Sequence, residues 1–301
     1  MSNRELVFYL NPCGSERRSI MRTLVEAGIR RIGTDGCLWH PDKNHAEIAS
    51  FRRDLDEFGL CLYSAHAVPS ILADAARETP QDLMENLLAD LRRISLWGGQ
   101  TAVYHGCWMR DVPRDKFDEA IEAVGWTPFV ERNVRTIRLL AREAARSGIT
   151  IVLENVWHSV HAKSVHGLME IIDAVGEPNV WICLDSGHAH LAGVSVADQV
   201  RAAGKLLRDM HFHDNEGPRD GPILDPHDQH IPPGLGTINW QDVCQALDEI
   251  DYPGPIVFEG VLGPEDSIEK GRFGGKVSHQ ELIDITIRNW HAFEAIAAKS
   301  R

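Results

Sequence analysis

Short runs of apolar residues alternate along the whole chain with longer segments in which apolar residues recur every three or four positions. The short runs predict eight β-strands, over 6–10, 30–35, 60–66, 101–105, 150–154, 180–185, 207–213 and 255–259. The longer segments predict helices over 15–27, 46–58, 80–97, 127–147, 164–175, 240–250 and 279–298. In the third of these, Leu83, Leu87, Leu91 and Ile94 fall on one helical face.

Regular alternation of strand and helix is typical of a parallel sheet with helices packed against it. Eight such units in 301 residues predict an α/β fold of the single (β/α)8 barrel (TIM-barrel) type, with residues 1–301 forming one domain. An open, doubly wound sheet is the alternative. Such sheets often carry a GxGxxG turn after the first strand, which the segment NPCGSE (11–16) does not match.

The ends of the predicted strands carry metal-ligand side chains. In a (β/α)8 barrel the catalytic residues lie at the C-terminal ends of the strands. The third to eighth strands all end in a histidine or a carboxylate, and these residues are His66, His105, Glu154, Asp185, His211 with His213, and Glu259. Such residues are a minor share of ordinary composition, so a run of six by chance is improbable. The pattern predicts a strongly polar barrel mouth.

A second concentration of such side chains follows the seventh strand, where Asp214, Asp225, His227, Asp228 and His230 precede a glycine-rich turn. Clustered carboxylates repel one another and lose hydration unless a cation neutralises them. His188 follows Asp185 by about one helical turn, and Asp228 alternates with His230, so each pair can direct two side chains to one centre. The cluster therefore predicts a metal site.

The mixture of ligand types narrows the choice of metal. Glu154, Asp185, His211 and Glu259 offer three carboxylates and one imidazole, which suits Mn²⁺, Mg²⁺, Co²⁺ or Zn²⁺. Additional imidazoles from His66, His105 and His230 favour Zn²⁺ or Mn²⁺. The cofactor prediction is thus a divalent metal of one of these four kinds.

Each residue taken alone has a simpler interpretation. A single strand-end histidine is more often a hydrogen-bonded residue than a ligand, and a single strand-end glutamate often caps the following helix. His213 can lie beside His211 and contact the ligands without joining them. We predict a loop or helix-surface position for His158, His161, His166, His190, Asp225 and His227. Trp39, Trp108 and Trp157 can either wall a pocket or pack in the rim.

Charge and cysteine content bear on the partners. The formal net charge of −13 argues against chain-wide attraction to nucleic acid or to acidic membranes, and favours a small-molecule substrate. The six cysteines are widely spread with no CxxC pair, so we predict reduced thiols. The N-terminus lacks the apolar run of a signal peptide, and no stretch has transmembrane length. We predict a cytoplasmic protein, with a homo-oligomer left open.

Five segments together resemble one family, the xylose isomerase-like barrels, which group sugar and sugar-phosphate isomerases and epimerases with endonuclease IV. The matching segments are IVLEN (151–155), CLDSGHAHLAG (183–193), MHFHDN (210–215), DQHIPPGLGTINW (228–240) and PIVFEG (255–260). The resemblance implies that Glu154, Asp185, His211 and Glu259 bind one divalent ion. It also implies that Glu154 and Glu259 exchange protons on opposite sides of an enediolate, while His188 binds a substrate oxygen.

This resemblance predicts a metal-dependent isomerase or epimerase acting on a sugar, keto-sugar or cyclitol. The electrostatic reason is that a proton next to a carbonyl is too weakly acidic for a free carboxylate to remove quickly, so a metal must stabilise the developing enolate oxygen. The predicted ligands, in order, are Glu154, Asp185, His211 and Glu259, then His188, Asp228, His230, His66 and His105.

Other activities stay open. The same nine residues match the ligands of the three zinc ions in endonuclease IV, which implies a phosphodiesterase acting on abasic DNA; the acidity of the chain argues against it. A metal-dependent lyase or hydratase on a keto-sugar needs the same enolate chemistry. A sugar-binding barrel without catalysis is the third possibility.

The chain also departs from the family in two places. Many ketose epimerases carry an arginine soon after the strand-seven histidine, but HFHDNEGPRD (211–220) has only Arg219 nearby. The segment EGVLGPED (259–266) is acidic and lacks a glycine turn that would hold a phosphate. These departures argue against the usual ketohexose binding mode and against assuming a phosphorylated substrate.

Overall fold

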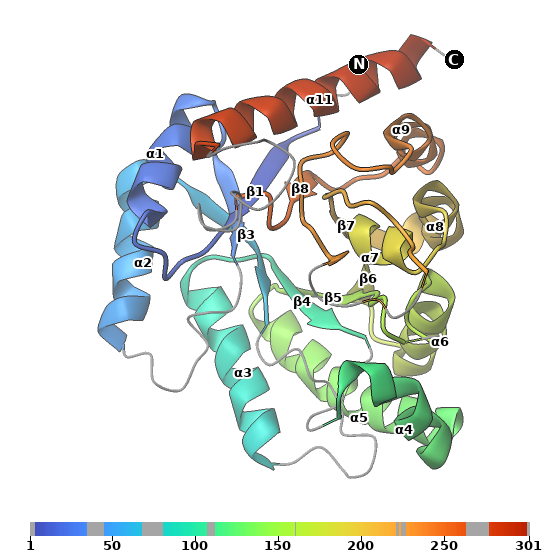
Figure 1. The fold of residues 1–301 in the computed structure, drawn as a ribbon. Helices are drawn as coiled ribbons and strands as arrows, with labels where there is room; N and C mark the ends of the chain where they lie inside the picture. The colour runs from blue at the N-terminus through green and yellow to red at the C-terminus, as the bar shows by residue number, and fades with distance from the viewer. Residues whose placement is uncertain are drawn as a thin grey trace.

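A computed structural model describes residues 4–34, 45–67, 81–106, 112–159, 161–220, 223, 227–262 and 277–299. Eight parallel strands close into a barrel in sequence order, with β8 pairing with β1 (Figure 1). The strands are β1 (Leu6–Leu10), β2 (Arg31–Thr34), β3 (Cys61–His66), β4 (Thr101–His105), β5 (Thr150–Glu154), β6 (Val180–Asp185), β7 (Leu207–His211) and β8 (Ile256–Phe258). The predicted barrel is therefore confirmed, and the open sheet is excluded.

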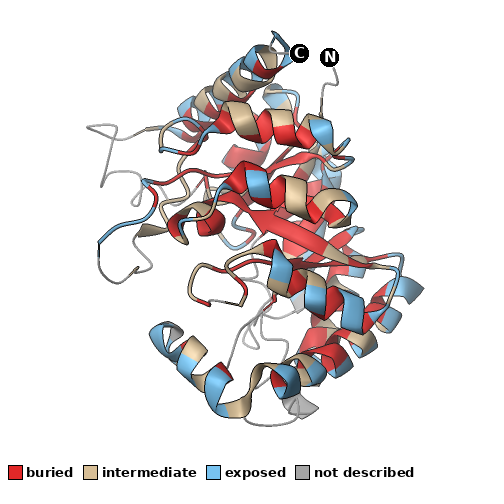
Figure 2. Ribbon diagram, turned by 90° about the vertical axis from the view of Figure 1, so that its right-hand side faces the viewer, coloured by how far each residue is buried: buried red, intermediate tan, exposed pale blue. Residues whose placement is uncertain are grey.

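Helices surround the strands (Figure 1). They are α1 (Arg17–Glu26), α2 (His45–Phe58), α3 (Gln81–Leu96), α4 (Phe117–Val124), α5 (Trp126–Arg146), α6 (Val165–Val175), α7 (Ser186–Leu191), α8 (Val196–Ala203), α9 (Trp240–Glu249) and α11 (His279–Lys299), with short 3₁₀ turns η2 (Arg114–Lys116) and η3 (Gly204–Leu206). Figure 2 shows the buried residues on the strands and on the helix faces turned toward them. All seven predicted helices are present, with ends shifted by at most two residues.

The differences from prediction are local. β7 ends at His211, two residues earlier than predicted, and Glu259 lies just after β8 rather than inside it. Helices α4, α7 and α8 were not predicted. Helix α7 has only six residues, too few for the apolar period of a helix to be recognised. At Gly125, a φ of 92° separates α4 from α5.

Alternation of side chains along the strands separates an outer core from the barrel interior. In β5, Ile151 and Leu153 belong to the large core that includes the helices, whereas Val152 packs with Val103 and Cys183 in a small separate cluster. Because side chains alternate in a strand, Glu154 faces the same way as Val152, at the end of β5. The strand period thus directs the terminal polar residue into the barrel mouth.

The prediction of reduced thiols is wrong for Cys13. Cys13 is disulfide-bonded, while Cys61, Cys183 and Cys244 are free thiols. No other cysteine stands within twenty residues of Cys13 in the sequence, so no short spacing indicates this bond. Cys37 and Cys107 lie outside the described residues. Of the helices described, none combines the length and apolarity that crossing a bilayer requires.

Candidate metal centre at the barrel mouth

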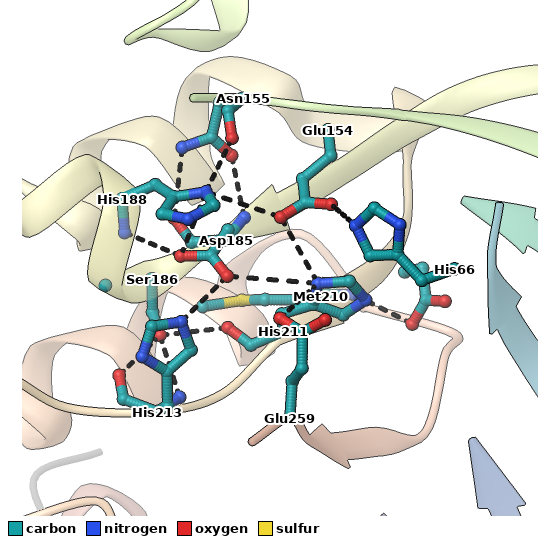
Figure 3. Close-up of polar contacts among 12 residues, drawn as sticks. His66, Glu154, Asn155, Asp185, Ser186, His188, Met210, His211, His213 and Glu259 are labelled. Carbon is teal, nitrogen blue, oxygen red and sulfur yellow. Dashed lines mark hydrogen bonds and ion pairs between the residues drawn. The ribbon is translucent and has the colours of Figure 1, made fainter. Parts of the chain in front are cut away.

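Four side chains predicted as the first ligands converge at the C-terminal ends of β5 to β8. One ligand atom each from Glu154, Asp185, His211 and Glu259 lie within 4.8 Å of one another. His211 Nδ1 lies 3.4 Å from Glu154 Oε1, 3.8 Å from Asp185 Oδ2 and 2.9 Å from Glu259 Oε2. Figure 3 shows these carboxylates turned toward the His211 ring. The arrangement offers three carboxylates and one imidazole to a single point.

The strand register explains this convergence. Asp185 pairs with His211 across β6 and β7, and Glu154 pairs with His105 across β5 and β4. Equivalent positions on neighbouring parallel strands bring their side chains to the same level of the barrel. Asp185 has a second role, because its Oδ1 accepts the backbone N–H of His188 at 2.6 Å and caps the start of α7.

The carboxylates of the site are held in their charged form. Burial opposes ionisation of Glu154, but the charge of His211 and the contact with His188 outweigh it and lower the pKa of Glu154 well below its ordinary value. Burial likewise opposes ionisation of Glu259, and His211 again lowers the pKa of that carboxyl well below its ordinary value. Both glutamates are therefore available as anionic ligands or as proton acceptors.

A second group of possible ligands shares Glu154. His66, at the end of β3, and His105, at the end of β4, join Glu154 in a set whose ligand atoms lie within 4.8 Å. His66 Nε2 lies 3.0 Å from Glu154 Oε2 and 3.1 Å from His105 Nε2. Burial lowers the pKa of His105 to about 3, which keeps its nitrogens free of a second proton. The structure thus brings together both predicted imidazoles of this group.

The third group of possible ligands differs from the set of nine residues that resembles the zinc ligands of endonuclease IV. Asp228 and His230 form a set with His213, which is not one of those nine residues. The rings of His213 and His230 are stacked, with centroids 3.9 Å apart and planes 10° apart. Because the lone pair of an imidazole nitrogen lies in the ring plane, two parallel rings do not converge on one ion. In this arrangement the two imidazoles therefore do not bind the same ion.

His188 lies between the first site and the third group. Its Nδ1 is 2.9 Å from the carbonyl oxygen of Asn155 and 3.3 Å from Glu154 Oε1. Its Nε2 is 3.1 Å from Asp228 Oδ2. Burial lowers the pKa of His188, but Asp185 and Asp228 raise it well above the ordinary value. The His188 ring therefore contacts both Glu154 and Asp228.

A cavity of about 160 Å³ opens above these groups. Its lining residues are His66, His105, Glu154, Trp157, His158, His188, Asp228, His230 and Glu259. The cavity has room for a small molecule, since one water occupies roughly 30 Å³ in the liquid. Trp157 lines this pocket, as one of its two predicted roles required. His158, which lies in the loop after β5 in keeping with its predicted loop or helix-surface position, also lines it.

Most of the other histidines considered above lie outside these groups of possible ligands. His161 is stacked on Trp126 at 4.2 Å, and His190 Nε2 lies 2.7 Å from Thr237 Oγ1. His166 is exposed, and His227 is half-buried. Asp225, Trp39 and Trp108 lie outside the described residues. His213, predicted as a weaker ligand or a supporting contact, is fully buried against Asp185.

A further observation supports a divalent ion at the first site, which is formed by Glu154, Asp185, His211 and Glu259. Glu154 Oε1 and His211 Nδ1 are buried and point into the site, and no well-aligned hydrogen bond joins either atom to a described residue, although Glu259 Oε2 lies 2.9 Å from His211 Nδ1. Buried polar atoms with poorly aligned contacts are costly, and a cation would satisfy both. Three carboxylates with one imidazole match the ligand preferences of Mn²⁺, Co²⁺, Zn²⁺ and Mg²⁺.

The family profile of the xylose isomerase-like TIM barrels matches residues 22–272. The chain belongs to this family. Among its relatives is the D-psicose 3-epimerase of Agrobacterium fabrum, 26% identical over 247 residues, or 76% of each chain. The D-psicose 3-epimerase of Enterocloster bolteae is 26% identical over 142 residues, which span 44% of this chain and only 43% of that relative.

A solved structure of a D-psicose 3-epimerase in the presence of D-fructose has the same fold as this family member. The two superpose with a TM-score of 0.72 over 97% of this chain and 99% of the other, at 18% identity. An identity this low supports the shared fold alone. Family membership and the shared fold establish the barrel, and the four ligand atoms within 4.8 Å at its mouth offer a site for a metal.

Proposed function

We propose that the protein is a divalent-metal-dependent isomerase or epimerase that moves a proton next to the carbonyl of a sugar, keto-sugar or cyclitol. The observation that carries this proposal is the convergence of Glu154, Asp185, His211 and Glu259 within 4.8 Å at the mouth of a xylose isomerase-like barrel. When bound there, the ion supplies Lewis-acid stabilisation of negative charge on the substrate oxygens. The protein residues carry out the proton transfers.

Glu154 and Glu259 are the two proton-transfer groups. They come from β5 and from the end of β8, which are three strands apart in the barrel, and both line the cavity. Their lowered pKa values keep both carboxylates deprotonated. One carboxylate removes the proton from carbon, and the other, after taking up a proton from solvent, delivers it to its own side of the planar enediolate. Return to the opposite face gives an epimer, and return to the neighbouring carbon gives an isomer.

His188 orients the substrate in this proposal. Its Nε2 lies at the cavity wall, 3.1 Å from Asp228 Oδ2. A substrate hydroxyl can replace that carboxylate contact or bridge to it. Trp157 and His158 complete the wall on the side of β5. Their flat rings suit the face of a sugar ring.

The test is exchange of solvent deuterium into substrate carbon. Metal-loaded protein is incubated in D₂O with a panel of ketohexoses, keto-glycosides and inososes, and the products are followed by NMR. We expect exchange with at least one compound, and its loss in Glu259→Gln. Glu249→Gln is the control, because Glu249 is an exposed partner of Arg201 far from the barrel mouth. Unchanged exchange and unchanged bound metal in Glu259→Gln would refute the proposal. Product analysis separates epimerisation from elimination or hydration.

A second candidate is a zinc-dependent phosphodiesterase acting on abasic DNA. The group formed by His66, His105 and Glu154 favours it, because this group adds a second possible metal position beside the first. The net charge of −13 opposes it, since affinity for DNA depends on neutralising phosphates. Chelator-sensitive cleavage of an abasic duplex by zinc-loaded protein would support this function, and no cleavage with every site loaded would exclude it.

A further inference from the structure

His213 is a fully buried side chain that the proposed chemistry does not use. It lies two residues beyond the end of β7, and its Nε2 is 2.8 Å from Asp185 Oδ2 (Figure 3). A carboxylate can only accept, so Nε2 carries the hydrogen and donates it. The other oxygen of Asp185 accepts the His188 backbone N–H at 2.6 Å. Asp185 is therefore held at both oxygens.

The position of the His213 ring is built by the residues that follow Asp185. A Cβ atom added at Gly187 would lie 2.0 Å from His213 Cε1, so only glycine leaves space for the ring there. Ser186 fixes the adjoining backbone: its Oγ accepts the His213 N–H at 3.1 Å and lies 2.8 Å from the His213 carbonyl oxygen. The segments 185–188 and 211–213 thus fit together residue by residue.

The face of the His213 ring lies against the segment that carries Asp228 and His230. His230 stacks on His213 at 3.9 Å, and its backbone has a φ of 45°, which is uncommon for a residue other than glycine. The segment is pinned at its next residue, because Asp214 and Ile231 exchange backbone hydrogen bonds of 2.7 and 3.1 Å. His213 therefore touches a ligand of the first site with its nitrogen and the mouth segment with its ring face.

We propose that His213 is a positioning residue that orients Asp185 for metal binding and seats His230, so that it couples the metal site to the segment 227–231. This inference rests on the proposed metal site at Asp185. Groups that hydrogen-bond to metal ligands typically contribute about 10- to 100-fold to metal affinity. Coupling through one ring means that displacing the ring disturbs both the site and the segment.

The test uses two variants that remove the same contact in different ways. His213→Gln removes the ring, and Gly187→Ala keeps His213 but places a methyl group where the ring lies. Each is expected to weaken binding of Mn²⁺ to the metal-stripped protein by about 10- to 100-fold, measured by calorimetry. The double variant is expected to bind Mn²⁺ no more weakly than the single variant with the larger loss of affinity, because both changes break the same hydrogen bond. Matched controls are His190→Gln, in the same helix α7, and Gly14→Ala, where a Cβ meets only ordinary contacts.

A second measurement does not depend on metal. Hydrogen exchange of the backbone amides in 227–231 is followed in the metal-free protein, and we expect it to be faster in Gly187→Ala and in His213→Gln than in both controls. The inference is overturned if wild type binds Mn²⁺ and both variants bind it within twofold, or if the two effects simply multiply in the double variant. Absence of Mn²⁺ binding in wild type would contradict the proposed function, and unchanged exchange in 227–231 would then overturn this inference separately.

Discussion

Replacing Glu154 by glutamine tests the electrostatics of the metal-free site. The Glu154 side chain is 1% exposed and lies 3.0 Å from His66 Nε2, whose own side chain is 14% exposed. Removing one partner of a buried ion pair costs about 3–5 kcal/mol, and the partial exposure of His66 places this pair near the lower end. At about 2 °C per kcal/mol for a chain of this size, the midpoint of thermal unfolding should fall by roughly 6 °C.

The loss should depend on pH in a defined direction. The folded-state pKa of Glu154 is lowered, so its contribution is present above about pH 4.3 and is lost as the pH falls through the lowered value. Burial lowers the pKa of His66, but Glu154 raises it above the ordinary value. The His66 contribution is therefore present below about pH 6.5 and is lost as the pH rises through its folded pKa. The destabilisation should be largest near pH 5.5 and smaller at pH 9.5.

The assay is thermal unfolding of chelator-treated wild type and Glu154→Gln at these two pH values. Glu143→Gln is the control, because Glu143 forms a surface pair with Arg146 at 2.6 Å. Such a pair contributes at most about 1 kcal/mol. An equal loss of stability at both pH values, or no loss at pH 5.5, would refute the assignment of charges in the site.

Three further predictions follow from contacts around the site. Tyr9→Phe removes the hydroxyl 3.4 Å from His211 Nε2 and should weaken Mn²⁺ binding about 10-fold or more in calorimetry. Tyr104→Phe should not, because the buried Tyr104 hydroxyl makes no hydrogen bond to the described part of the chain; equal effects would contradict this role of Tyr9. Asp214→Asn should speed hydrogen exchange across 234–240, whose N–H groups donate to this carboxylate at 2.8 to 3.2 Å, and unchanged exchange would show that other contacts hold the segment. Chelation should lower the melting temperature, and metal added at 1,000 times its Kd should restore about 4 kcal/mol; a melting temperature insensitive to metal would contradict a specific site.

The strand pattern predicted much of this site because its physical basis is local. Side chains alternate along a strand, so Glu154 and Asp185 at the ends of apolar runs necessarily share the direction of the interior residues before them. A barrel then brings neighbouring strand ends to one level, and His105 and His211 follow in the same way. Convergence was therefore predictable from the alternation and the fold class together.

The parts that were missed depend on contacts between distant segments. Nothing in the spacing of His213 indicates that its ring fills the space above Gly187, 26 residues earlier, because that fit exists only after β6 and β7 have paired. The position of His158 in the cavity wall depends likewise on the conformation of its loop. The stacking of His213 on His230 is a third case, because these residues are 17 positions apart in the sequence.

The most direct test of the central claim is a crystallographic anomalous-scattering measurement combined with elemental analysis of the purified protein. The account predicts one fully occupied divalent ion bound by Glu154, Asp185, His211 and Glu259, at distances of about 2.0–2.3 Å. Stoichiometric metal elsewhere with this position empty would contradict it, as would no retained metal after incubation with Mn²⁺, Co²⁺, Zn²⁺ and Mg²⁺. Three zinc ions would favour the phosphodiesterase instead.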